Sequence, residues 1–254
     1  MMEFQDQMDR RIRLEKVPER IVSLVPSQTE FLVDIGLEEQ LVGITKFCIH
    51  PVGLKRKKTI IGGTKNFHFN KIETLKPDLI IGNKEENYQE GIERLSEQFP
   101  VWMSDIYDLE DALEMMALLG EITEREASAR EIISKIRSGF ERKLPFRGTA
   151  IYLIWQEPMI AVGSNTFIDD LLQRAGFANL ISKERYPEIS KEEILSLKPD
   201  FLLLSSEPYP FGEKHLEEYQ RMFPDTTVRL VDGEMFSWYG SRLIKAADYI
   251  TALK

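Results

Sequence analysis

The chain has 254 residues, of which 43% are hydrophobic and 30% charged, a composition typical of a soluble globular protein. Its formal net charge of −9 argues against nucleic-acid binding, since the one basic run, Lys55–Lys58, is short and isolated. No apolar stretch approaches the ~20 residues of a membrane-spanning helix, and the single cysteine, Cys48, excludes an internal disulfide.

Residues 1–20 are charged throughout and contain no apolar h-region, so no signal peptide is predicted within them. We therefore expect a cytoplasmic protein if Met1 is the native start. An exported protein is expected instead if a leader has been removed.

Alternating strands and helices are predicted along the first half of the chain. Arg20–Val25 has the pattern of a buried strand, and Pro26 opens a helix that ends at Gly36. Ser27 and Glu30 have the spacing of a capping box. Further strands are predicted at 41–44, 79–81 and 101–103, with helices before residue 77 and at 89–98. This alternation indicates a parallel α/β sheet.

A helical pattern extends from about residue 109 to residue 143. One apolar stripe at helical spacing contains Ile122, Ala129, Ile133, Ile136 and Phe140. We therefore predict one long linking helix, residues 121–143, between an N-terminal lobe, residues 1–120, and a C-terminal lobe, residues 144–254. In the second lobe, strands are predicted at 150–154, 159–162, 201–203 and 227–231, with helices at 167–175 and from 241.

The phrase Leu-Lys-Pro-Asp occurs twice, at Leu75–Asp78 and at Leu197–Asp200. Each copy predicts the end of an amphipathic helix, a Pro-Asp turn and a short apolar strand. Glu85 and Glu207 each follow the proline of their own copy by eight residues. The expected fold is therefore α/β, with two pseudo-symmetric lobes of mostly parallel sheets joined by one long backbone helix.

Several segments together resemble the cobalamin- and iron-siderophore-binding proteins of ABC importers, the helical-backbone metal receptors. The matching segments are Asp6–Arg10, Pro18–Glu30, Leu75–Ile81, the long linking helix and Trp238–Arg242. The resemblance covers nearly the whole chain. It implies a metal chelate, cobalamin or a ferric siderophore, held in the cleft between two lobes, with no catalysis and no intrinsic cofactor. We expect a monomer.

The same resemblance implies that one glutamate on each lobe docks with arginines of an ABC permease. The positions that match are Glu207 and Glu85, and Glu86 competes with its neighbour for the role. Paired surface charges can steer and orient a docking partner. The alternative is that these are ordinary solvated acids.

Ligands collect at the carboxyl ends of parallel strands, where aromatic side chains offer flat contact area to a corrin or a siderophore. The candidates near such ends are Phe47, His50, Trp155, Tyr186, Trp238, Tyr239 and Arg242. Arg242 could meet a carboxylate or phosphate bidentately. His50 is the one candidate metal ligand, for instance to cobalt below a corrin. Ordinary packing is the alternative for the aromatic residues, a structural or cleft-lining role for His50, and a position on a helix surface for Arg242.

Two other functions stay open, a cytoplasmic cofactor carrier or cofactor-processing enzyme and a receptor for free zinc or manganese. The nucleotide-binding, hydrolase and metalloprotease motifs with a known mechanism are missing, which disfavours an enzyme. A free-metal site needs several convergent ligands, and only His50 lies near a predicted strand end.

Overall fold

The computed structural model describes residues 1–253 and contains two compact units. The N-terminal unit comprises residues 1–106, 110–137 and 239–244, and the C-terminal unit comprises 107–109, 138–238 and the chain from 245 onward. Segment 239–244 belongs to the N-terminal unit, whereas the sequence predicted a contiguous C-terminal lobe, residues 144–254. Within the described residues, no helix is both long enough and apolar enough to cross a membrane.

The N-terminal unit is built on a five-stranded parallel sheet in the order β5-β4-β3-β6-β7. Its strands are β3 (Ile21–Ser23), β4 (Leu41–Ile44), β5 (Thr59–Ile60), β6 (Leu79–Asn83) and β7 (Val101–Ser104). Its helices are α1 (Pro26–Asp34), α2 (Leu54–Lys57), α3 (Phe69–Leu75), α4 (Gln89–Ser96), α5 (Leu109–Ile122) and α6 (Glu126–Phe140), the last continuing into the other unit.

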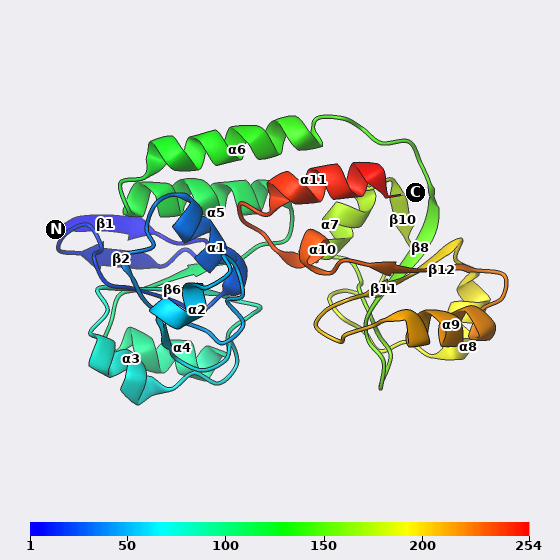
Figure 1. Ribbon diagram of the computed structural model, residues 1–254, viewed down its shortest axis with the longest axis horizontal. Helices are drawn as coiled ribbons and strands as arrows, with labels where there is room; N and C mark the ends of the chain where they lie inside the picture. The colour runs from blue at the N-terminus through cyan, green and yellow to red at the C-terminus, as the bar shows by residue number, and fades with distance from the viewer. Residues whose placement is uncertain (254) are drawn as a thin grey trace. The chain divides into compact units, whose positions relative to one another are not determined.

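Apolar residues on both faces of this sheet explain why helices cover it on both sides. Val22, Leu24 and Ile80 share one buried cluster with Ile72 of α3 and Ile92 of α4. Figure 1 shows α3 and α4 on that side of the sheet and α1 and α5 on the other. The predicted parallel sheet is therefore confirmed for this unit.

The C-terminal unit has a sheet in the order β10-β8-β11-β12, all parallel, with β9 antiparallel to β8. Its strands are β8 (Gly148–Trp155), β9 (Ile160–Ala161), β10 (Phe177–Asn179), β11 (Phe201–Ser205) and β12 (Thr227–Val231). Its helices are α7 (Phe167–Arg174), α8 (Lys191–Leu197), α9 (Glu213–Met222), α10 (Glu234–Ser237) and most of α11 (Leu243–Ala252).

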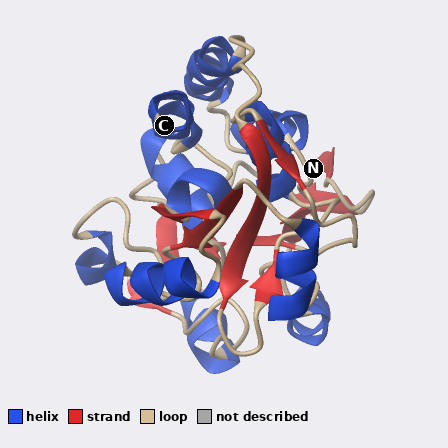
Figure 2. Cartoon of the chain, turned by 90° about the vertical axis from the view of Figure 1, so that its right-hand side faces the viewer, coloured by secondary structure: helices blue, strands red, loops and turns tan. Residues whose placement is uncertain are grey.

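Successive residues of β8 face opposite sides of the sheet. Ile151 and Leu153 join a cluster with Ile194 of α8 and Tyr219 of α9. The ring of Tyr152 meets Phe236 of α10 edge-on, with centroids 5.3 Å apart. Helices therefore lie on both faces of the sheet. Figure 2 shows the strands of the chain in red among the helices in blue.

The helical stretch forms two helices, α5 and α6, with a turn at residues 123–125. The helix that continues from one unit into the other is α6, residues 126–140, which lies within the predicted range of 121–143 but is shorter. Glu124 has a left-handed backbone (φ 53°), and the N–H of Arg125 bonds the carbonyl of Gly120. A Cβ at Gly120 would lie only 2.6 Å from that of Ala129, so the glycine lets α6 approach α5 closely. The result is a helical hairpin (Figure 1).

The repeated phrase has the same structure in both units. Lys76 and Lys198 end their helices with nearly identical left-handed dihedral angles, φ 48° ψ 59° and φ 49° ψ 58°. The carboxylate of Asp78 accepts the N–H of Arg20 at 2.8 Å, just before β3, and that of Asp200 accepts the N–H of Thr149 at 2.7 Å, in β8. Each aspartate thus ties the start of its own strand to the neighbouring strand. The internal repeat is confirmed.

The N-terminal hairpin was not predicted from the sequence. The first residues form an antiparallel hairpin of β1 (Met2–Gln5) and β2 (Arg11–Leu14). Asp6 closes its turn by accepting the N–H groups of Met8 and Arg10, and it also accepts the N–H of Met103 in β7. This buried carboxylate therefore fixes the hairpin to the sheet edge.

Candidate functional site

Polar side chains line the carboxyl ends of the N-terminal sheet. Ser23, Thr45, Asn83 and Ser104 end or follow β3, β4, β6 and β7, and all four are buried. Asn83 donates its amide to the Ser104 hydroxyl at 3.0 Å, and Gln28 donates to the same oxygen. These hydrogen bonds make the sheet edge a fixed polar base for the loops above it.

Two predicted contacts lie in the loop after β4. The Phe47 ring is 49% exposed, with the ammonium of Lys46 4.9 Å from its centroid. His50 is half-buried and precedes Pro51 through a cis peptide bond. An exposed aromatic at a strand end is available for contact with a flat ligand.

Trp155 is the last residue of β8, and its side chain is 39% exposed. Its indole N–H donates to the carbonyl of Glu157 at 3.1 Å. Its ring meets Tyr209 edge-on, with centroids 5.5 Å apart and planes at 69°. The indole is therefore held in place while part of it faces solvent.

Tyr186 is half-buried in the loop before α8. The guanidinium of Arg185 lies 5.8 Å from its ring centroid and 5.5 Å from that of Tyr107, which follows β7. The residues predicted to contact a ligand included Tyr186 but not Arg185, Tyr107 or Tyr209. Tyr209 had a usable signal, since it stands in the loop directly after the strand of the second repeat copy.

Trp238 and Glu207 form one unit of structure. Trp238 is only 8% exposed, and its indole N–H donates to Glu207 Oε1 at 2.8 Å. The hydroxyl of Ser237 donates to the same oxygen at 2.9 Å. Trp238 therefore holds a carboxylate and is buried, in keeping with the packing alternative, and its contact with a ligand stays a prediction.

Burial raises the pKa of Glu207 above its usual range, and the hydrogen bonds from Ser237 and Trp238 offset only part of this rise. The folded state therefore binds the proton more tightly than the unfolded state does. As the pH rises from the ordinary pKa of a glutamate to the raised pKa of Glu207, the contribution of Glu207 to the stability of the folded state therefore falls.

We expect Glu207→Gln to remove that pH dependence. The amide keeps an oxygen acceptor for Ser237 and Trp238 but does not ionise. Free energies of unfolding measured by urea between pH 4 and pH 7 should show the wild type losing stability relative to the variant as pH rises. A constant difference across this range would contradict the burial of the carboxylate.

Arg242 meets a carboxylate bidentately, as predicted from its chemistry, but the partner is Glu30 of the same unit. Nε lies 2.8 Å from Oε2 and Nη2 lies 2.7 Å from Oε1, and Arg242 is 5% exposed. This ion pair also replaces the predicted capping box, because α1 starts at Pro26 without a capping side chain among the described residues. Neighbouring Tyr239 is likewise buried.

The acidic candidates of the N-terminal unit follow β6. The backbone N–H groups of Glu85 and Glu86 both donate to Asn83 Oδ1, at 2.9 and 3.0 Å. In the C-terminal unit Ser205, at the end of β11, accepts the N–H of Glu207 at 3.4 Å. In each unit, the polar side chain that ends the repeated strand therefore fixes the turn carrying the acids.

Residues 21–226 match the family described as Periplasmic binding protein, which is most of the chain. The chain belongs to this family. A vitamin B12-binding protein of Pectobacterium carotovorum subsp. carotovorum (strain PC1) is 24% identical over 244 residues, covering 92% of this chain and 87% of that protein.

Solved structures share the fold of this chain. The periplasmic vitamin B12-binding protein of Vibrio cholerae has a TM-score of 0.76 at 21% identity, covering 92% of this chain and 95% of that one. The periplasmic heme-binding protein of Roseiflexus sp. RS-1 has a TM-score of 0.79 at 18% identity, covering 92% and 97%. The fold class expected from the sequence is confirmed, with a shorter helix between the units than predicted.

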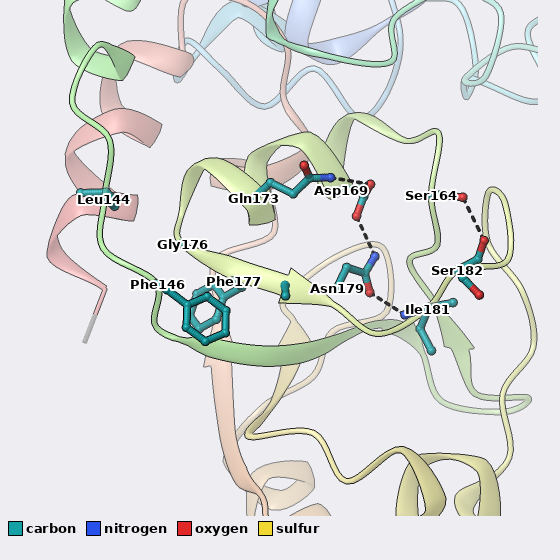
Figure 3. Close-up of a pocket in the computed structure, with 11 residues that line it drawn as sticks. Leu144, Phe146, Ser164, Asp169, Gln173, Gly176, Phe177, Asn179, Ile181 and Ser182 are labelled. Carbon is teal, nitrogen blue, oxygen red and sulfur yellow. Dashed lines mark hydrogen bonds between the residues drawn. The ribbon is translucent and has the colours of Figure 1, made fainter.

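A cavity of about 520 Å³ lies beside the edge strand β10, between α7 and the loop before β8 (Figure 3). Its main polar groups bond one another: Asp169 accepts from Asn179 at 2.8 Å and from Gln173 at 3.0 Å. None of the predicted ligand-binding residues lines it.

Across residues 1–253, no three His, Cys, Asp or Glu side chains gather in a group that could hold a metal ion. Cys48 is buried and shares hydrogen bonds with Thr29 and Thr45, and burial raises the pKa of its thiol. His50 as a single ligand to the metal of a chelate stays a prediction.

Proposed function

We propose that this protein is the substrate-binding component of an ABC importer and binds a metal chelate of the cobalamin, haem or ferric-siderophore type without chemistry of its own. The match of residues 21–226 to a family of binding proteins carries the proposal. The vitamin B12- and heme-binding relatives support the class of ligand. The proposed role places the protein outside the cytoplasmic membrane.

Two exposed aromatic side chains support a broad, flat ligand. Phe47 in the N-terminal unit and Trp155 in the C-terminal unit each follow or end a parallel strand and expose a large part of their rings. Rings with few rotatable bonds lose little conformational entropy when they contact a macrocycle. The position of the chelate in a cleft between lobes stays a prediction from the sequence.

Thermal unfolding in the presence of cyanocobalamin, haem and ferrichrome tests the proposal. A ligand that binds only the native state, present at a hundred times its Kd, stabilises it by about 2.7 kcal/mol and raises the melting temperature. We expect one of the three chelates to do so. No shift with any of them would leave the proposal without support.

Glu207 and Glu85 are the docking residues that we propose for the permease. Both stand eight residues after the repeated proline, and polar residues of the preceding strand fix both turns. This equivalence favours Glu85 over Glu86. The hydrogen bonds of Glu207 hold its carboxylate in a defined direction, which suits orientation of a basic partner.

We expect the double substitution Glu85→Gln and Glu207→Gln to weaken binding to the permease by about tenfold or more at low salt, with chelate affinity unchanged. Binding of loaded protein to the permease in nanodiscs measures this. The matched control is Glu121→Gln, which changes an exposed acid of α5. Equal loss of chelate and permease binding would show that the glutamates do not act in docking.

A further inference from the structure

Trp155 packs against Tyr209, whose hydroxyl lies in a chain of hydrogen bonds that ends on a histidine. The hydroxyl of Tyr209, whose ring packs against the indole, donates to Gln156 Oε1 at 2.5 Å. The same hydroxyl lies 3.2 Å from Nε2 of His215, in the first turn of α9. Two side chains from two other segments, Gln156 and His215, therefore meet at the phenol oxygen of Tyr209.

The other nitrogen of His215 decides its tautomer. Nδ1 accepts the backbone N–H of Gly212 at 3.0 Å, which caps α9. Because a neutral imidazole has one donor and one acceptor, Nε2 carries the proton and donates it to the Tyr209 hydroxyl. That hydroxyl is then free to give its own proton only toward Gln156. The direction of every hydrogen bond in the chain is thus fixed.

We propose that His215 is a positioning residue for ligand binding, acting through Tyr209 to hold the exposed indole of Trp155. The inference rests on the proposed function, because Trp155 must contact the chelate. Tyr209 packs edge-on against the rings of Trp155 (5.5 Å) and His215 (5.4 Å), and its ring is tilted by 59° to that of Phe211, 4.7 Å away. Hydrogen bonds to its oxygen restrain the phenol from swinging away from the indole.

The two nitrogens of His215 can be replaced one at a time. Asparagine places a polar atom near the position of Nδ1, so His215→Asn keeps an acceptor for Gly212 and loses the bond to Tyr209. Glutamine reaches the position of Nε2, so His215→Gln keeps a donor for Tyr209 and loses the cap of α9. The pair separates positioning from helix capping.

We expect His215→Asn to weaken binding of the chelate by about three- to tenfold, the loss of one hydrogen bond that orders a contact residue. His215→Gln should stay within about twofold of wild type in affinity but should unfold at lower urea concentration. Binding is measured by fluorescence titration with the chelate that stabilises the wild type, and unfolding by circular dichroism.

Acrylamide quenching without ligand gives a second readout that does not depend on the proposed function. The signal of Trp155 is the difference between each protein and the same protein carrying Trp155→Phe. We expect stronger quenching of Trp155 in His215→Asn than in wild type or His215→Gln. If no chelate binds the wild type, the proposed chelate-binding function is contradicted. Stronger quenching of Trp155 in His215→Asn alone would still support the positioning role of His215.

Two results would overturn the inference. One is quenching of Trp155 that is equal in His215→Asn and wild type. The other is a loss of affinity that follows stability, largest in His215→Gln, since that pattern belongs to a residue that only caps a helix.

Discussion

Replacing Arg242 by alanine is expected to lower the free energy of unfolding by about 3–5 kcal/mol, because it leaves the buried carboxylate of Glu30 without its partner. The two side chains are 5% and 10% exposed and form two hydrogen bonds of 2.7 and 2.8 Å. Glu30→Ala should cost a similar amount. Urea unfolding at pH 7 measures both.

A matched pair on the surface provides the control. Arg137 and Glu110 form a bidentate pair between α6 and α5, with distances of 2.7 and 3.2 Å, but their side chains are 54% and 59% exposed. Arg137→Ala should therefore cost only about 0–1 kcal/mol. The double substitution Glu30→Leu with Arg242→Met should recover most of the loss, since it leaves no buried charge unpaired. Equal effects of Arg137→Ala and Arg242→Ala would refute the role of burial.

Trp155→Ala is expected to weaken chelate binding by about 10- to 100-fold, the usual range for a large aromatic residue at the centre of a binding surface. The indole is both partly exposed and held in place by Glu157 and Tyr209. Binding therefore requires little further ordering of this side chain. Fluorescence is unsuitable for this variant, so calorimetric titration is the measurement.

The control for Trp155 is Phe146→Ala. Phe146 is 72% exposed in the same unit and lines the cavity beside β10, so its removal should leave chelate affinity unchanged. Trp155→Phe should lose about three- to tenfold, because the aromatic face remains while one hydrogen bond is lost. Equal weakening by Phe146→Ala and Trp155→Ala would indicate a general effect on the unit.

The strands could be predicted because each one is marked by residues next to each other in the sequence. Short apolar runs bounded by turn residues gave the strands, and the two Leu-Lys-Pro-Asp phrases gave matched helix ends at Lys76 and Lys198. The turn after α5 had no such signal. Glu124 takes the left-handed conformation that usually favours glycine, and the apolar stripe runs on through it.

Contacts between residues far apart in the chain could not be predicted from the sequence. Ser27 and Glu30 have the spacing of a capping box, yet Glu30 bonds Arg242, which is 212 residues away in the chain. The same limit applies to the aromatic candidates. Trp155 and Trp238 both follow strands, but only the fold shows that the first is exposed and the second is buried against Glu207.

Fluorescence titration of the wild-type protein with cyanocobalamin, haem and ferrichrome tests the central claim most directly. We predict saturable quenching by one of these chelates, with one molecule bound per chain and a Kd in or below the micromolar range. Trp155→Phe should change the amplitude of that quenching. A folded protein that shows no saturable response to any of the three would contradict the proposed function.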